Sequence, residues 1–304
     1  MSAAVPGPST MVSDRDLPPL FQSSDQWAIA RQSESFRVVR TQLFVLLAAT
    51  TAAMLAERLD SRVPAVVAAV LYAASIGLGL HIARRRARTR WQAHRAAAEL
   101  LKSLAWQYMV HGGPFHSRVP HPEALFEEHL EARLRELRKV GWQDPRNGPA
   151  ARGAGQITAT MRAVRSKAFE VRRDIYLRDR LLEQQLWYKN RAAQAHRAAA
   201  LWSSVTALLT LLALMAAVLR ALGMFDGWDL TGLFSTAAAA GVAWQELRRH
   251  RPLTYAHSLV EQDLDTLRVA MTTTVTESGW ADAVTEAERL VSPQHSDWLG
   301  TFGR

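Results

Sequence analysis

The chain has 304 residues, and its 37 lysines and arginines against 28 acidic residues give a net charge of +9. It contains no cysteine, which excludes a disulfide scaffold, a thiolate metal site and a cysteine nucleophile. A basic balance alone does not separate a membrane surface from nucleic acid as the partner. The positions of the charges along the chain are therefore more informative than their sum.

The first segment, residues 1–24, is rich in proline, serine and alanine. It lacks the basic start and apolar run of a signal peptide. This composition is typical of segments that bury too little apolar surface to fold. We therefore expect a disordered cytoplasmic tail over residues 1–24.

Four strongly apolar stretches without Asp, Glu, Lys or Arg follow, at 41–56, 63–83, 198–219 and 230–245. A membrane-spanning helix needs about 20 apolar residues. The second and third stretches meet this length, and arginines that reach the lipid headgroups can extend the other two. The alternative is that these stretches are buried helices of a soluble bundle, but helices of a soluble protein need a polar stripe that faces water. The alanine-rich fourth stretch would also suit a helix packed inside protein. We predict an all-α integral membrane protein with four transmembrane helices in two hairpins.

Arginines gather on one side of these stretches, whereas the two hairpin turns, 57–62 and 220–229, are nearly neutral. By the positive-inside rule, the turns lie outside, and both termini and the middle segment are cytoplasmic. We expect a multi-pass protein of the plasma membrane whose arginines contact anionic lipid headgroups. The arginines that carry this prediction are Arg84, Arg85, Arg86, Arg88, Arg90, Arg197, Arg248, Arg249 and Arg251.

The two halves resemble an internal repeat, because each hairpin is followed by an arginine cluster and an amphipathic helix, at 91–110 and 255–271. Leu100 aligns with Leu264 when the halves are superposed. A charged amphipathic helix over 123–139 and a Pro/Gly-rich linker over 141–155 separate the halves. We predict a first unit at 25–140 and a second unit at 156–304, which begins with a long helix over 156–197.

Apolar residues in this long helix step by three and four, which predicts a heptad seam with one interruption at Arg178. The seam either packs on its own chain or joins copies of the chain through cytoplasmic coiled coils into a homo-oligomer. Its members are Ile157, Met161, Val164, Ala168, Val171, Ile175 and Leu182.

No catalytic constellation or phosphate-binding loop is evident, so we expect no enzymatic activity and no cofactor. The loop residues His111, His116 and His121 fit no standard zinc spacing. Nucleic acid is not an expected partner, because arginines beside apolar spans are better explained by lipid.

Small and weakly polar residues recur within the spans. They either pack the helices together through hydrogen bonds and close contacts or line an aqueous pore. The absence of mid-span charges argues against an ion-coupled transporter. The candidates are Thr50, Thr51, Ser75, Gly79, Ser203, Thr206, Thr210, Thr231 and Ser235.

Several residues together resemble motifs of the SLATT family, in two tandem units covering about 25–300. The segment 176–189 resembles the helix that leads into the family's hairpin, the segment 90–115 resembles the one that follows it, and 292–298 resembles the family's end. The first unit lacks a clear copy of the Tyr-Arg-Gln-Trp-Tyr pattern. The matching residues are Arg90, Trp91, Glu99, Trp106, Tyr108, Pro114, Phe115, Tyr176, Arg180, Gln184, Trp187, Tyr188 and Trp298.

The resemblance implies a two-transmembrane effector of a bacterial conflict or antiviral defence system. Such proteins are regarded as forming pores or perturbing the membrane when a cytoplasmic sensor protein or a nucleotide signal triggers them. We therefore expect a membrane effector that oligomerises. The alternative is a membrane-anchored scaffold that recruits partners through its coiled coil and basic helices.

Overall fold

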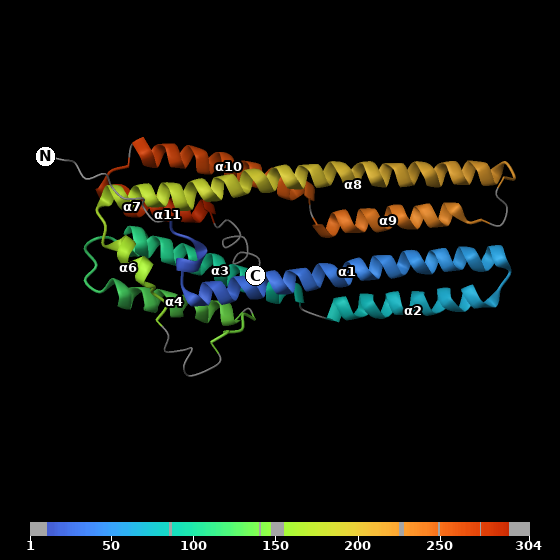
Figure 1. The fold of residues 1–304 in the computed structure, drawn as a ribbon, viewed down its shortest axis with the longest axis horizontal. Helices are drawn as coiled ribbons and strands as arrows, with labels where there is room; N and C mark the ends of the chain where they lie inside the picture. The colour runs from blue at the N-terminus through green and yellow to red at the C-terminus, as the bar shows by residue number, and fades with distance from the viewer. Residues whose placement is uncertain are drawn as a thin grey trace. The chain divides into compact units, whose positions relative to one another are not determined.

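The computed structural model describes residues 11–84, 87–139, 141–146, 155–224, 228–248, 250–273 and 275–291, without the side chains at 31, 32, 35, 83, 84, 87–92 and 250–253. The described residues form helices joined by turns and contain no strand (Figure 1). The α-helices are α1 (Pro19–Leu59), α2 (Arg62–Arg84), α3 (Ala87–Val110), α4 (Pro122–Lys139), α6 (Ala159–Arg165), α7 (Phe169–Tyr176), α8 (Glu183–Ala221), α9 (Leu230–Arg248), α10 (His250–Thr273) and α11 (Trp280–Val291). Shorter elements are the 3₁₀ turns η1 (Asp14–Asp16), η2 (Gly113–Phe115) and η4 (Glu277–Gly279) and the π-helical turn η3 (Leu177–Leu182).

The two halves of the chain have the same order of elements, which confirms the predicted internal repeat. The series α1, α2, α3, η2 and α4 corresponds to α8, α9, α10, η4 and α11. Residues 164 apart are equivalent: α2 ends at Arg84 and α9 ends at Arg248, and η2 and η4 begin at residues 113 and 277. This is the same spacing that aligns Leu100 with Leu264.

The helices form two compact units, each built from both halves of the sequence. Unit 1 comprises Met1–Ala30, Thr89–Lys189 and Ser258–Arg304, and unit 2 comprises Arg31–Arg88 and Asn190–His257. The Pro/Gly-rich linker does not separate the units, because the whole stretch Thr89–Lys189 belongs to unit 1. Of this linker, residues 147–154 lie outside the described residues.

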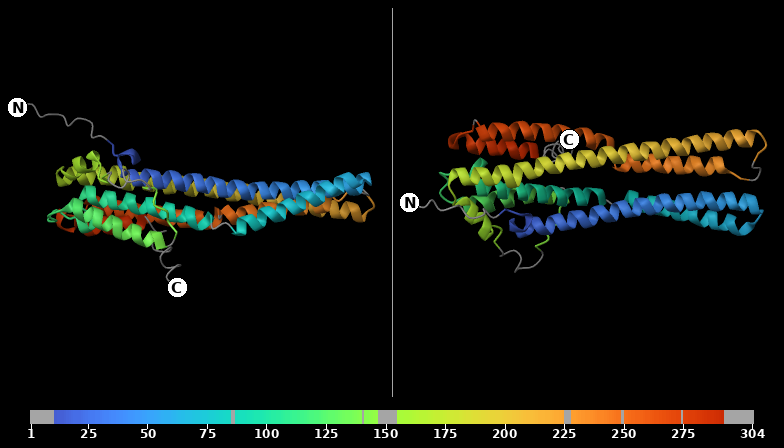
Figure 2. Two further views of the ribbon diagram at one scale, coloured as in Figure 1. Left: turned by 90° about the horizontal axis from the view of Figure 1, so that it is seen from below. Right: turned by 45° about the horizontal axis from the view of Figure 1, so that its top comes forward.

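Unit 1 is a helical bundle around one apolar core. The predicted helices 91–110, 123–139 and 255–271 are confirmed as α3, α4 and α10. Helix α4 buries Phe126, Leu130, Leu134 and Leu137 at three- and four-residue steps, which is the spacing of one helix face. Helix α10 lies along α7 and the beginning of α8 (Figure 2), where Gln185 donates a hydrogen bond to Asp265 at 3.0 Å.

The prediction of a disordered tail over 1–24 is wrong for residues 11–24, while residues 1–10 lie outside the described part of the chain. Leu17, Leu20 and Phe21 are buried in the core of unit 1. The Asp14 carboxylate lies 2.6 Å from the buried Lys102 ammonium, and other polar groups of the segment are also satisfied. The low average hydropathy of this segment concealed apolar residues spaced to cover the bundle.

The predicted continuous helix over 156–197 is also wrong. Ser166 ends α6, and the extended backbone of Ala168 precedes α7, so the heptad spacing does not correspond to one helix face. The structure places Ile157, Met161, Val164 and Ile175 in the core of their own chain. In contrast, Ala168, Val171 and Leu182 are exposed. The heptad pattern therefore combines two different environments.

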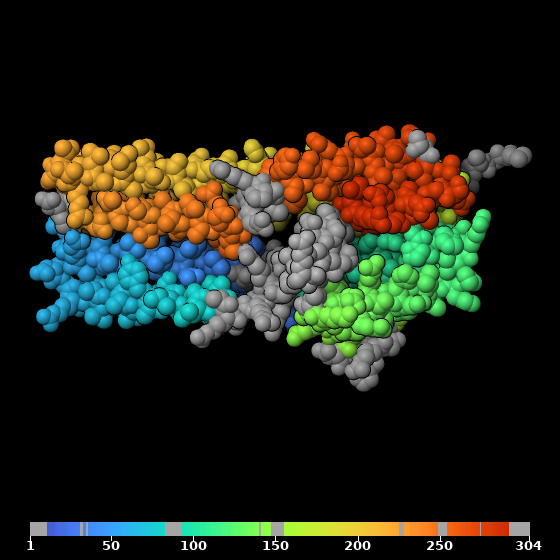
Figure 3. Space-filling view, turned by 180° about the vertical axis from the view of Figure 1, so that it is seen from behind, coloured from blue at the N-terminus to red at the C-terminus, as the bar shows by residue number. Residues whose placement is uncertain are grey.

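Unit 2 contains the apolar stretches as helices. Three helical segments, Phe36–Leu59, Arg62–Ile82 and Phe169–Ala221, are long and apolar enough to cross a membrane, and the most apolar part of each is largely unburied within the protein. The segment Phe169–Ala221 begins in unit 1 and continues into unit 2. Helix α1 lies along α2, and α8 lies along α9 (Figures 1 and 3). Helix α9 is not among these three segments, so the fourth span remains a prediction.

Candidate functional site

Several residues of the SLATT-like motifs come from distant parts of the chain and meet in the core of unit 1. The rings of Trp106 on α3 and Tyr176 on α7 have centroids 5.9 Å apart in an edge-on contact. Tyr176 makes a similar contact with Trp280 of α11 at 5.8 Å. Beside them, Tyr108 packs edge-on against Phe115 at 5.9 Å. The motif therefore specifies how the helices of the two halves pack together.

A buried ion pair joins the π-helical turn η3 to α11. The Arg180 guanidinium contacts the Glu288 carboxylate twice, with Nε to Oε1 at 3.0 Å and Nη2 to Oε2 at 2.7 Å. The Tyr176 hydroxyl also donates to Glu288 Oε1 at 2.9 Å. Both charged side chains are almost completely buried. π-Helical turns frequently occur at functional sites, and here the turn carries a charged member of the motif, Arg180.

Further contacts hold α11 in place. Trp280 Nε1 donates to the Val110 carbonyl of α3 at 2.7 Å, and the Tyr188 hydroxyl donates to the Val291 carbonyl at 3.1 Å. The sequence prediction included Tyr188 but missed Glu288 and Trp280. A carboxylate on the otherwise apolar face of α11 was the available signal for Glu288. Together these contacts make α11 the closing helix of unit 1.

The remaining motif residues are less uniform. Glu99 pairs with Arg95, Pro114 lies in η2, Gln184 is half-buried and Trp187 is exposed. The side chains of Arg90 and Trp91 and the whole of Trp298 lie outside the described residues.

The loop histidines do not come together. His111 is half-buried, and its Nε2 lies 3.0 Å from Arg172 Nη1 and 3.2 Å from the Arg165 carbonyl. Burial, together with the positive charges of these two arginines, lowers the pKa of His111 to about 4. His116 and His121 are exposed. Within the described ranges, no three His, Asp or Glu side chains form a group suited to a metal ion.

Several polar residues of unit 2 connect the two helices of one hairpin. In the first hairpin, the Gln42 amide donates to the Ser75 carbonyl at 3.4 Å, and Thr50 Oγ1 lies 3.4 Å from the Tyr72 hydroxyl. In the second, Gln245 Nε2 donates to Thr206 Oγ1 at 3.0 Å. The sequence prediction missed Gln42, Tyr72 and Gln245. Gln42 and Gln245 lie near the ends of their spans, and Tyr72 combines an apolar ring with a polar hydroxyl.

Two glycines and five other residues complete this set. An added Cβ would lie 2.9 Å from Gln42 Nε2 at Gly79 and 3.0 Å from Thr206 Oγ1 at Gly241, so both glycines allow close packing. Thr51 and Thr210 donate to the carbonyls four residues earlier. The half-buried Ser203 and Thr231 and the exposed Ser235 and Thr210 remain candidates for either role.

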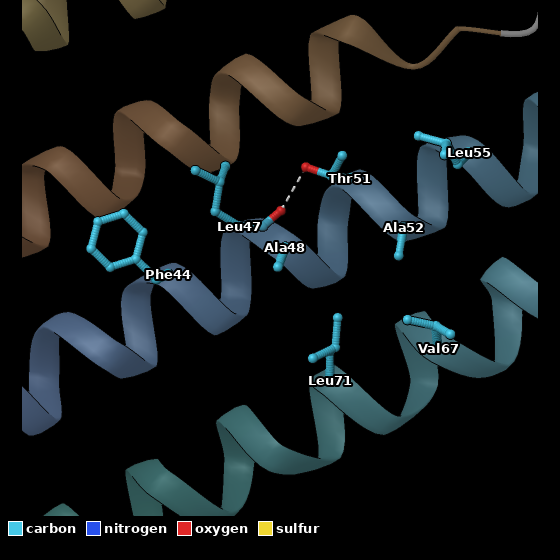
Figure 4. Close-up of a pocket in the computed structure, with 8 residues that line it drawn as sticks. All are labelled: Phe44, Leu47, Ala48, Thr51, Ala52, Leu55, Val67 and Leu71. Carbon is cyan, nitrogen blue, oxygen red and sulfur yellow. Dashed lines mark hydrogen bonds between the residues drawn. The ribbon is translucent and has the colours of Figure 1, made fainter.

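A shallow groove of about 540 Å³ lies between α1 and α2 (Figure 4). Its surface is almost entirely apolar, and the Thr51 hydroxyl at its edge is bonded to the Leu47 carbonyl at 2.9 Å. This surface suits hydrocarbon and offers little to a polar ligand. The lining residues are Phe44, Leu47, Ala48, Thr51, Ala52, Leu55, Val67 and Leu71.

The two ends of unit 2 differ in their charged contacts. At the turn end, Arg220 lies 3.9 Å from Glu57 and 3.4 Å from Asp229. At the other end, Arg248 packs against aromatic rings, and Arg197 is exposed. The other arginines that carry the topology prediction, Arg84, Arg85, Arg86, Arg88, Arg90, Arg249 and Arg251, lie outside the described residues or have side chains that do.

Comparison with known proteins gives one clear relationship. Residues 18–173 match the SMODS and SLOG-associating 2TM effector domain 3, and residues 176–298 match the SMODS and SLOG-associating 2TM effector domain 1. The two matches meet within α7. No curated protein and no solved structure matches the chain. The chain therefore belongs to the SLATT family of two-transmembrane effector domains and carries two such domains in tandem.

Proposed function

We propose that this protein is a membrane effector that assembles from several copies and opens a pore, or otherwise perturbs the plasma membrane, when a cytoplasmic sensor protein or a nucleotide signal triggers it. The observation that carries the proposal is a two-transmembrane effector domain in each half of the chain, together with the apolar helices of unit 2. The chain acts physically on the bilayer and catalyses no reaction.

The proposed topology has four spans, with both termini and unit 1 in the cytoplasm. Helix α9 has 19 residues, and its length of about 28 Å matches the roughly 30 Å hydrocarbon core. Trp228 precedes this helix and Trp244 lies near its end, consistent with the aromatic belts of spanning helices. The arginine clusters support the orientation.

Assembly from several copies is proposed because polar groups such as Gln42 and Gln245 are used between helices of one hairpin. A water-filled path would need polar faces from neighbouring chains. Thr210 and Ser235 are exposed on unit 2 and are available for such faces.

Induced expression in bacteria with a membrane-potential dye tests the proposal. We expect depolarisation by the wild-type chain. The control variant Leu208→Arg places a charge near the middle of the predicted span 198–219, which costs about 2.5–3.5 kcal/mol for insertion, and should not depolarise the cells. A wild-type chain that is present in the membrane fraction but leaves the potential unchanged would favour the scaffold instead.

A further inference from the structure

Arg248, the last residue of α9, is held by aromatic rings in unit 2. Its guanidinium carbon lies 4.4 Å from the centroid of the Phe36 ring and 5.1 Å from that of the Trp244 ring. The Trp202 ring packs against Trp244 at 6.4 Å. We call Phe36, Trp202, Trp244 and Arg248 the Arg248 site. Stacking on aromatic faces fixes the plane of a guanidinium while leaving its edge available for hydrogen bonds.

The Arg248 site contains a positive charge that no carboxylate of the described residues balances. Among the described residues, no acid forms an ion pair with Arg248, and its buried Nε has no hydrogen-bond partner. The charged neighbour that acts on it is Arg191, a second cation. Glu246 lies two residues earlier, on a different face of the helix. A partly buried cation is costly without a compensating anion.

At the opposite end of the helix pair α8 and α9, an arginine is paired with carboxylates. There Arg220 contacts both Glu57 and Asp229. The contrast indicates that the anion for Arg248 comes from outside the described residues.

The position of Arg248 along α9 identifies the source of this anion, given the proposed insertion of α9. A helix of 19 residues reaches from one headgroup layer to the other. Arg248 at its end therefore lies at the level of the lipid phosphates, and its tryptophan neighbours are typical of this level.

We propose that the Arg248 site binds the phosphate of an anionic phospholipid. The guanidinium edge donates hydrogen bonds to phosphate oxygens, and Arg191 supplies a second positive charge that favours anionic over zwitterionic headgroups. The inference rests on the proposed membrane insertion. A soluble phosphate-bearing anion has the same binding chemistry, and the experiment separates the two sources.

Native mass spectrometry of the full chain in mild detergent tests the site, with phosphatidylglycerol as the probe and phosphatidylcholine as the zwitterionic comparison. We expect the wild type to retain phosphatidylglycerol in preference to phosphatidylcholine. Arg248→Gln should weaken this binding by about tenfold or more, because a charge-assisted contact is lost. Arg248→Lys keeps the charge without the planar fork and should give an intermediate affinity.

Arg220→Gln is the matched control, since it removes an arginine from the paired end, and it should bind like the wild type. Equal retention by Arg248→Gln and the wild type, or equal loss in both Gln variants, would overturn the site. Displacement of the lipid by millimolar inorganic phosphate would assign the site to a soluble anion instead. Alkaline extraction separates the two proposals: a wild-type chain lost from membranes overturns the proposed function, whereas an inserted chain that does not bind the lipid overturns only the site.

Discussion

The ion pair between Arg180 and Glu288 gives the sharpest test of how unit 1 is held together. Replacing Glu288 by alanine leaves the Arg180 guanidinium buried without its counter-charge and removes the acceptor of the Tyr176 hydroxyl. Breaking a buried pair in this way costs about 3–5 kcal/mol. Whole domains are stable by only about 5–15 kcal/mol. We therefore expect Glu288→Ala to unfold unit 1 or to leave it marginally stable.

Denaturation of the detergent-solubilised chain, followed by tryptophan fluorescence, measures this effect, because Trp106 and Trp280 both contact Tyr176. The matched control is Glu286→Ala on the same helix, which breaks an exposed contact with Arg289 at 3.4 Å. Exposed pairs contribute at most about 1 kcal/mol, so this variant should resemble the wild type.

A double variant separates the worth of the pair from the cost of leaving one charge alone. Arg180→Met combined with Glu288→Leu removes both charges, and such replacements of buried pairs are often neutral or stabilising. We expect the double variant to be more stable than Glu288→Ala alone. A loss below about 1 kcal/mol for Glu288→Ala would refute the reasoning, since it would mean that water reaches Arg180 at little cost.

Three further predictions follow from individual residues. Burial beside two arginines lowers the pKa of His111 to about 4, so its contribution to the free energy of unfolding should be complete above about pH 6.5, the unfolded value, and be lost as the pH falls to about 4. His111→Gln should make the melting temperature less dependent on pH over this window, and an unchanged slope would contradict the assignment. Val164→Asp should destabilise unit 1, because Val164 is buried. Val171→Asp should leave the fold intact, and its effect on oligomers in detergent tests self-association. Similar unfolding of both variants would contradict the packing. Gln245→Leu should weaken the second hairpin by about 0.6 kcal/mol in a denaturation assay, and a stabilised hairpin would show that its bond to Thr206 contributes nothing.

Most helices, including the three that are long and apolar enough to cross a membrane, were predictable from the sequence because hydropathy and helical spacing are local properties. The patterns of residues 63–83 and 123–139 predict helices without any information from the rest of the chain. The internal repeat was also predictable, since Leu100 and Leu264 lie 164 residues apart, which is the spacing between equivalent helices in the structure. The resemblance to the SLATT family identified the motif residues, but the sequence did not indicate that they meet in one core.

The errors concern contacts between distant residues. Leu17 and Phe21 look like isolated apolar residues in a proline-rich tail, and the polar partner of the neighbouring Asp14, Lys102, lies 88 residues away. The helix break between α6 and α7 involves neither proline nor glycine, so the heptad pattern continued across it. The carboxylate of Glu288 stands out on the apolar face of α11, but its partner Arg180 lies 108 residues away and could not be identified from local spacing.

The interleaved construction of unit 1 has a consequence for biosynthesis. Arg180 and Glu288 are separated by 108 residues, and the second apolar hairpin lies between them. At about 5–20 residues per second, a ribosome needs roughly 5–20 s to pass from one to the other. During this interval the guanidinium has no carboxylate and the bundle has no closing helix. The bundle can therefore be completed only after α8 and α9 have been synthesised.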